Sequence, residues 1–287
     1  MSHDSYRLAV PVGGCEPTEG LEQSIRTAAE LVRDRDRTGD LLIVSLLQLP
    51  EQTSLDRSNI DDSRLQKADD TATQLMRVSE ETGVIAEKTV QAVHHGATPI
   101  VELAANDGCE GVFVNTDTSQ SKRQPVLSAQ AAIEISTRAE ADVFVRKLVP
   151  GSNTIQRILL TVGGGPHSAL ATEAARALAI AHNAQVDITH IYSEDAATDL
   201  GKETMILQQA EETLSGIELF ETGLLPSDNA AEKIVDRSQK YDVTVLGTPT
   251  ADLLRQLVFG TTAGESENSQ AANAVLMARQ HPKKEQR

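Results

Sequence analysis

An internal repeat constrains the fold more than any other feature of this sequence. Residues 7–14 (RLAVPVGG) return 150 positions later as residues 157–164 (RILLTVGG). Residues 111–115 return 132 positions later as residues 243–247. Because the matching segments follow one another in the same order, the chain reads as a duplicated unit whose second copy is about 18 residues shorter.

Each half alternates short apolar segments, typical of buried strands, with longer amphipathic segments, typical of helices. In the first half, strands are predicted at residues 7–14, 40–47, 85–93, 111–114 and 142–146, and helices at about 21–35, 65–81, 99–106 and 125–138. In the second half, strands are predicted at residues 157–164, 186–192, 217–222, 243–247 and 273–277, and helices at about 170–181, 202–214 and 229–238. This alternation predicts a parallel sheet with helices on both faces in each half.

A short segment rich in Pro, Gly and Ser separates the two halves at residues 148–153. We therefore expect two domains, at residues 1–148 and 154–287. Each has ample length for a hydrophobic core of its own. With only 3 Tyr, 4 Phe and no Trp, that core must consist of Ala, Val, Ile and Leu, which suits parallel sheets.

Charge and cysteine content limit the partners and the compartment. The formal net charge of −16 repels nucleic acid and anionic membranes, so neither is an expected partner. An acidic, Lys-poor chain suits a high-salt cytoplasm such as that of a halophile, although ordinary acidic proteins share this trait. Two distant cysteines, Cys15 and Cys109, make no disulfide framework, and no signal peptide or membrane-spanning run is evident. We expect a cytoplasmic protein that is not a membrane protein.

The candidate binding element is the segment 243–262 (VTVLGTPTADLLRQLVFGTT). An apolar strand ends at Gly247, a helical patch follows, and Gly260 with Thr261 opens the next element. Glycines let backbone N–H groups approach oxygen atoms, Thr hydroxyls add donors, and a helix N-terminus adds partial positive charge. The segment therefore suits phosphate binding, and a strand-loop-helix junction without a ligand is the alternative.

The spacing of this segment resembles the nucleotide signature of the universal stress protein family. That signature is Gly, two residues, Gly, nine residues, Gly, then Ser or Thr; here the positions are Gly247, Thr250, Gly260 and Thr261. With the duplicated pattern, the chain resembles a tandem universal stress protein over nearly its whole length.

The resemblance implies two flavodoxin-like, doubly wound domains, each a five-stranded parallel sheet in the order 3-2-1-4-5 with helices on both faces. It also implies that the fifth strands, at 143–145 and 275–277, pair antiparallel and make the chain its own pseudo-dimer. Whether two chains form a homodimer stays open.

The resemblance places an ATP site, with Mg²⁺ or Mn²⁺ on the phosphates, in the C-terminal domain only. In such sheets, ligands lie beyond the carboxyl ends of the strands, where the strand order reverses. The predicted cofactor-binding residues are Gly163, Gly164, Ile191, Gly247, Thr250, Gly260, Thr261 and Thr262. Two positions depart from the family. Gly163 stands where nucleotide binders usually carry Asp, and the side chain of Thr250 either replaces a lost contact or blocks one.

The aligned positions of the first half are Asn115, Thr118, Ser128 and Ala129, so the phosphate cradle is lost and no nucleotide is expected there. Adjacent His94 and His95 would point to opposite faces of a strand end, which argues against a metal site. His167 lies at the mouth of the predicted site, as a phosphate contact, a pH sensor or a solvated loop residue. Asp187 and Glu218 are predicted as charges on the strand surface.

No catalytic residues and no metal ligands are predicted, so the favoured function is a stress-response regulatory module and not an enzyme. One alternative is a nucleotide-free scaffold or soluble regulator of a membrane transporter, since the family includes domains fused to or encoded beside permeases. A second alternative is a weak nucleotide hydrolase, because the same sheet architecture also hosts enzymes.

Overall fold

The computed structural model describes residues 6–13, 17–33, 39–56, 60–94, 97–106, 108–117, 129–148, 154–193, 199–247 and 274–281. The chain divides into two compact units, residues 1–144 and 145–287, and the boundary falls within the last strand of the first half, which is described with the first unit. None of the described helices is both long enough and apolar enough to cross a membrane.

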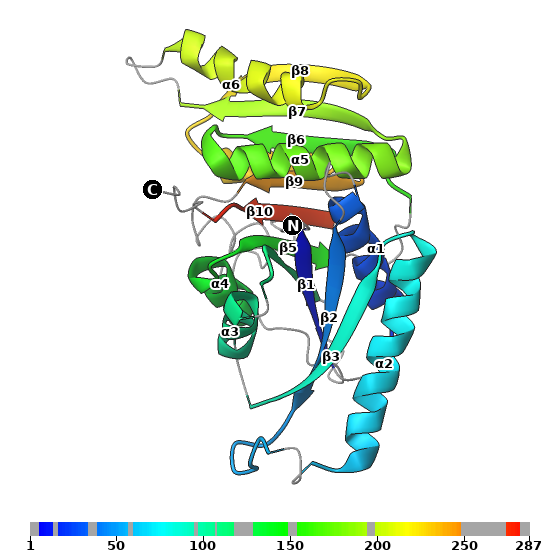
Figure 1. The fold of residues 1–287 in the computed structure, drawn as a ribbon. Helices are drawn as coiled ribbons and strands as arrows, with labels where there is room; N and C mark the ends of the chain where they lie inside the picture. The colour runs from blue at the N-terminus through cyan, green and yellow to red at the C-terminus, as the bar shows by residue number, and fades with distance from the viewer. Residues whose placement is uncertain are drawn as a thin grey trace, which may run out of the picture. The chain divides into compact units, whose positions relative to one another are not determined.

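The first unit is a parallel sheet with a helix between each strand and the next (Figure 1). Its elements are β1 (Arg7–Gly13), α1 (Glu19–Arg33), β2 (Asp40–Gln48), α2 (Asp62–Glu81), β3 (Ala86–Val93), α3 (Thr98–Asn106), β4 (Gly111–Asp117), α4 (Ala129–Arg138) and β5 (Asp142–Leu148). The strand order is β3-β2-β1-β4-β5, and β1 pairs parallel with both β2 and β4. Helices α1 and α2 pack together over β1, β2 and β3, while α3 packs against α4.

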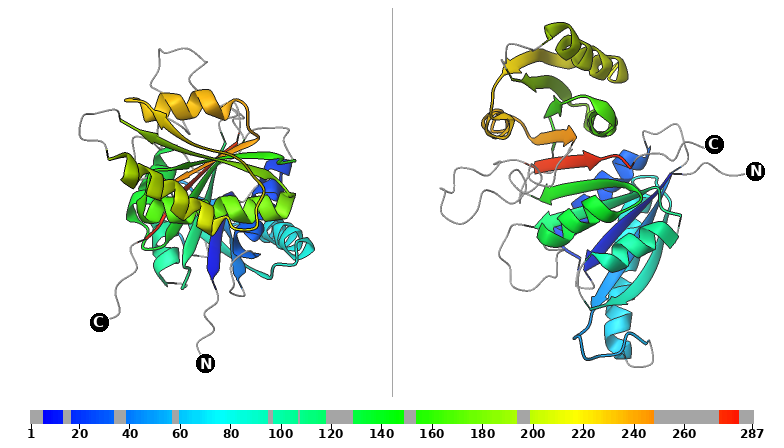
Figure 2. Two further views of the ribbon diagram at one scale, coloured as in Figure 1. Left: turned by 90° about the horizontal axis from the view of Figure 1, so that it is seen from above. Right: turned by 90° about the vertical axis from the view of Figure 1, so that its left-hand side faces the viewer.

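The second unit repeats this arrangement. Its elements are β6 (Arg157–Val162), α5 (Gly165–His182), β7 (Gln185–Tyr192), α6 (Leu200–Thr213), β8 (Leu219–Pro226), α7 (Ala230–Ser238), β9 (Val243–Gly247) and β10 (Ala274–Arg279). The strand order is β8-β7-β6-β9-β10, and α5 and α7 cover opposite faces of the sheet (Figure 2). Each unit thus has the predicted parallel sheet in the order 3-2-1-4-5, which confirms the doubly wound α/β class.

The strands form at the predicted places because their side chains are apolar toward both faces of the sheet. Ile158, Leu159 and Leu160 of β6 are all fully buried, as expected for a strand covered by helices on both sides. Helix α5 ends at Asn183, whose backbone is in the left-handed conformation (φ 52°) and donates to the carbonyl of Ala179. Asn is one of the few residues that tolerate this conformation, which makes it a good helix stop.

Strand β8 was predicted at residues 217–222, and the structure places it at Leu219–Pro226. The difference arises because the turn after α6 is longer than expected. Gly216 has a φ of +86° and the Ile217 amide donates back to the Leu214 carbonyl at 2.9 Å. Strand β8 therefore begins two residues after the predicted start. It pairs with β7 as far as the last residue of β7, and just beyond it the Ser227 amide donates to the Tyr192 carbonyl at 2.9 Å.

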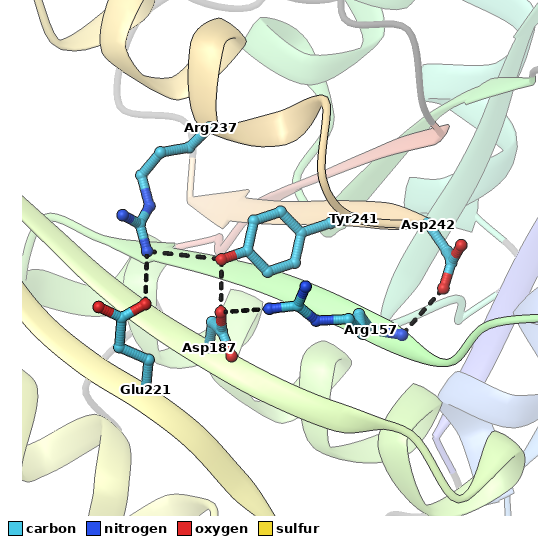
Figure 3. Close-up of polar contacts among 6 residues, drawn as sticks. All are labelled: Arg157, Asp187, Glu221, Arg237, Tyr241 and Asp242. Atoms are coloured by element: carbon cyan, nitrogen blue, oxygen red, sulfur yellow. Dashed lines mark hydrogen bonds and ion pairs between the residues drawn. The ribbon is translucent and has the colours of Figure 1, made fainter.

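The prediction that Asp187 is a surface charge is wrong. This residue of β7 is 1% exposed and accepts hydrogen bonds from the Tyr241 hydroxyl and, at 3.2 Å, from Arg157 Nη2 (Figure 3). The Arg157 guanidinium also lies over the Tyr241 ring, 4.9 Å from its centroid. Burial, followed by the hydrogen bond to Asp187, raises the pKa of Tyr241 to about 12. Glu218, by contrast, is exposed as predicted.

This network lies at the amino ends of the strands, because Arg157 opens β6 and Tyr241 precedes β9. Ligand sites of doubly wound sheets lie at the opposite, carboxyl ends. Asp242 completes the network by accepting from the Arg157 amide at 2.9 Å (Figure 3). We therefore assign the network to the stability of the second unit and not to ligand binding.

Candidate functional site

The point at which the strand order of the second unit reverses lies between β6 and β9. These strands pair parallel, with Thr161 opposite Leu246. The next residues along the two strands, Val162 and Gly247, therefore lie side by side. On the other side of β6, Val162 lies opposite His190 of β7. The carboxyl ends of three strands therefore meet at one edge, where ligands of this fold class bind.

Gly247 is the residue at which strand β9 comes closest to helix α5. A Cβ atom at this position would lie 2.5 Å from the carbonyl carbon of His167 and 2.7 Å from the amide nitrogen of Ser168. Both are backbone atoms, so neither could swing aside. Glycine is therefore required here by the close packing of β9 against the first turn of α5, whether or not a ligand is present.

The turn between β6 and α5 is an exposed stretch of glycine backbone. Gly164 and Gly165 have φ values of +80° and +74°, and no side chain of the described residues caps the N-terminus of α5. Pro166 carries no N–H, so Gly165 and His167 supply the amides of the first turn. The Gly163 amide is engaged with Ser168 Oγ at 2.9 Å. An uncapped helix N-terminus on glycine backbone suits an anionic group.

His167 is not a loop residue, because it lies in the first turn of α5. Its Nδ1 accepts a hydrogen bond from the Gln280 amide at 3.1 Å, which links α5 to the end of β10. Burial, and then the positive charge of Arg279, lowers the pKa of His167. The neutral ring is thereby favoured, and a neutral Nδ1 is what the Gln280 amide requires.

Ile191, the predicted adenine neighbour, is the penultimate residue of β7 and is partly exposed. The residue before it carried no recognised signal in the sequence. His190 is 4% exposed, and its ring contacts the carbonyl of Val162 and the carboxylate of Glu203 on α6. In the sequence, His190 is only a polar residue inside an apolar strand segment. A half-exposed strand has the same pattern, so the sequence does not show that His190 is buried.

The corresponding edge of the first unit is built differently. Asn115 of β4 stands at the position of Gly247, and Ser45 of β2, opposite Val12 in the register, stands at the position of His190. Asn115 is 4% exposed, and neither atom of its amide has a hydrogen-bond partner among the described residues. A buried amide therefore occupies the position at which the second unit has a glycine packed against α5.

Replacing Asn115 by Leu, which has nearly the same shape, should raise the free energy of unfolding by about 1 kcal/mol. The change removes a buried donor and acceptor that have no partners, and such groups cost about 1–3 kcal/mol each. Urea denaturation measures the difference. As a control, Ser79→Ala removes a buried hydroxyl that does donate, to Val84 O at 2.9 Å, and should lower stability by a similar amount. A stability loss in Asn115→Leu would show that the amide has a partner in solution.

The remaining candidates lie outside the described residues. These are Thr250, Gly260, Thr261 and Thr262 of the second-half motif, Thr118 and Ser128 of the first, and His95 and Cys15. Of Ala129 only the backbone is described, as the first residue of α4. Within the described part of the chain, no group of three or more His, Cys, Asp or Glu side chains could hold a metal ion.

The fold and its switch-point edge define a doubly wound α/β protein. No protein-family model matches the sequence, and neither does any curated protein. The structure is similar to a universal stress protein from Archaeoglobus fulgidus DSM 4304, with a TM-score of 0.62 and 14% identity over 96% of this chain and 97% of that one. It is also similar to a putative universal stress protein from Pseudomonas aeruginosa UCBPP-PA14, with a TM-score of 0.54 and 17% identity over 97% and 95% of the two chains.

A third similar structure is part of a membrane transporter. It is the cytoplasmic domain of a prokaryotic cation chloride cotransporter, with a TM-score of 0.57 and 11% identity over 98% of this chain and 97% of that one. At these identities the likenesses establish the fold that the three proteins share with this chain.

Proposed function

We propose that this protein is a tandem universal stress protein that binds ATP in its second unit and acts as a cytoplasmic regulatory module, not as an enzyme. The observation that carries the proposal is the exposed glycine backbone beside Gly247. There the ends of β6 and β9 and the uncapped start of α5 come together at the switch point of the sheet.

The described residues fit the phosphates of a nucleotide in two respects. The first turn of α5 presents backbone N–H groups and the positive end of an 18-residue helix. Gly163 and Gly165 are exposed, and a Cβ at either would meet none of the described residues within 4 Å, which leaves the backbone open to a ligand. Thr250 and Gly260–Thr262 would complete the cradle, and Mg²⁺ or Mn²⁺ would bind phosphate oxygens there.

The first unit supports the other half of the proposal, which is that only one nucleotide binds per chain. Asn115 buries an amide where the second unit has Gly247, and its motif contains no glycine. The first unit would then serve as a structural partner of the second.

Mass spectrometry of the ligand released from denatured, freshly purified protein tests the proposal. We expect close to one ATP or ADP per chain. Gly260→Val should abolish binding because it places a bulky side chain in the predicted phosphate motif. Ser128→Val, the same kind of change at the aligned position of the first half, should leave binding unchanged.

Two nucleotides per chain would contradict the assignment to the second unit. Nucleotide loss in Ser128→Val alone would move the site to the first unit. Slow ATP hydrolysis that disappears in Gly260→Val would support the weak-hydrolase alternative.

The second candidate function is that of a nucleotide-free soluble regulator of a membrane transporter. The likeness to the cotransporter's cytoplasmic domain over nearly the whole chain favours it. If the purified protein carries no nucleotide and millimolar Mg-ATP causes no thermal shift, this candidate becomes the better one.

A further inference from the structure

His190 is the most buried ionisable side chain at the candidate site, and both of its ring nitrogens face an acceptor. Nδ1 lies 2.6 Å from the carbonyl oxygen of Val162, the last residue of β6. Nε2 contacts a carboxylate oxygen of Glu203, in the first turn of α6. The ring therefore connects the ends of β6 and β7 to the helix that follows β7.

Both contacts can be hydrogen bonds only if the pair carries two protons. A neutral ring with an ionised carboxylate carries only one. A neutral imidazole has one N–H, and a backbone carbonyl can only accept. Satisfying both acceptors requires either the imidazolium with ionised Glu203, or a neutral ring with protonated Glu203. The first arrangement places both N–H groups on the ring, satisfies the two acceptors and leaves Glu203 as a carboxylate.

Two nearby titratable groups, on α6 and on α5, have partners of their own. In the same row of the sheet, His190 lies between Val162 of β6 and Leu224 of β8. Lys202, beside Glu203, points instead to Asp199, at 4.0 Å. On α5, His167 accepts a hydrogen bond from the Gln280 amide.

The helix that carries Glu203 also covers the glycine turn of the candidate site. A Cβ on Gly164 would lie 3.1 Å from Cδ1 of Ile206, one turn along α6. Gly163 directly follows Val162, whose carbonyl the ring holds. The same histidine therefore contacts both α6 and the strand end that leads into this turn.

We propose that His190 and Glu203 are a positioning pair, whose shared proton holds α6 and the end of β6 in the geometry that binds nucleotide. The inference rests on the proposed function, since the nucleotide site is the one that the pair supports. Nucleotide affinity should fall as the pH rises and the pair loses this proton. The first unit has no such pair at the corresponding position. Ser45 stands there in place of His190, and its hydroxyl has no partner among the described residues.

The test compares Glu203→Gln with Glu212→Gln in the full chain. A glutamine amide can donate to a neutral Nε2, so Glu203→Gln keeps the contact without the extra proton. Glu212 lies on the exposed face of the same helix, so its variant removes the same charge and serves as the control. Because both variants are titrated with the same Mg-ADP, the pH dependence of the nucleotide itself cancels in the comparison.

Isothermal titration calorimetry at about pH 6 and about pH 9 gives the first readout. We expect the wild type and Glu212→Gln to bind Mg-ADP about tenfold more weakly at the higher pH, a coupling within the range usual for linked sites. Glu203→Gln should show little change. Equal pH profiles in the two variants would overturn the proposal.

Nitrogen-15 NMR of the His190 ring gives a second readout that does not depend on nucleotide. At about pH 7 the wild-type ring should carry protons on both nitrogens, and the Glu203→Gln ring should carry one. A wild-type ring with one proton would overturn the pair even if nucleotide binds. If the wild-type ring carries two protons but the protein binds no nucleotide, the proposed function and the positioning role are both wrong. The shared proton of the pair would still be established.

Discussion

Gly247→Val should lower the free energy of unfolding by about 3 kcal/mol, at the upper end of the usual cost of overpacking. The new Cβ would lie 2.5 Å from the carbonyl carbon of His167 and 2.6 Å from its oxygen. Because both belong to the backbone of α5, the strand or the helix must move as a whole. Urea denaturation followed by circular dichroism measures the loss.

Gly223→Val is the matched control for this prediction. Gly223 lies on β8 of the same sheet, and a Cβ there would meet no atom of the described residues within 4 Å. Its substitution should change stability by no more than about 0.5 kcal/mol. Equal losses in the two variants would show that close packing at Gly247 is not the cause. The expected result also means that Gly247 is a poor probe of nucleotide binding, whereas Gly260 is the better one.

Asp187→Ala should lower the free energy of unfolding by about 3 kcal/mol, because removing one member of a buried charge network leaves its partners uncompensated. The Tyr241 hydroxyl would lose its acceptor, and Arg157 would lose its counterion beneath the tyrosine ring. Urea denaturation at neutral pH measures the effect.

Glu221→Ala is the control for the Asp187 prediction, since Glu221 lies at the exposed end of the same network. Its side chain is 59% exposed and pairs with Arg237 at 3.4 Å. Such a surface pair contributes at most about 1 kcal/mol. If Asp187→Ala cost no more than Glu221→Ala, the buried network would not stabilise the unit. Nucleotide binding should survive in both variants, because the network lies at the edge of the sheet opposite the candidate site.

The order of strands and helices was predictable because it depends on local patterns. Apolar segments such as residues 40–47 and 157–162 are too short for helices, and the repeat shows that one arrangement occurs twice. The boundary error at β8 arose where a turn around Gly216 extended beyond the helix, and turn length leaves little trace in hydrophobic periodicity.

The candidate site was only partly predictable. The exposed glycine turn after β6 and the glycine at the end of β9 were both singled out from the sequence, and the structure places them at one switch point. His190 and Asp187 were not recognised, because a polar residue in an apolar strand looks the same whether it faces solvent or a buried partner. Their partners, Glu203 and Tyr241, lie 13 and 54 positions away in the sequence.

The sequence by itself determined the duplicated α/β pattern, the acidic composition and the loss of the glycine motif from the first half. These properties are local or compositional, so they can be read without knowing which residues touch. Only the tertiary structure decided that Gly247 is required for packing against α5, that Asp187 belongs to a buried network, and that His190 bridges β6 and α6. Each of these depends on close approach between distant segments, and helix packing sets such distances to a fraction of an ångström, which no periodicity records.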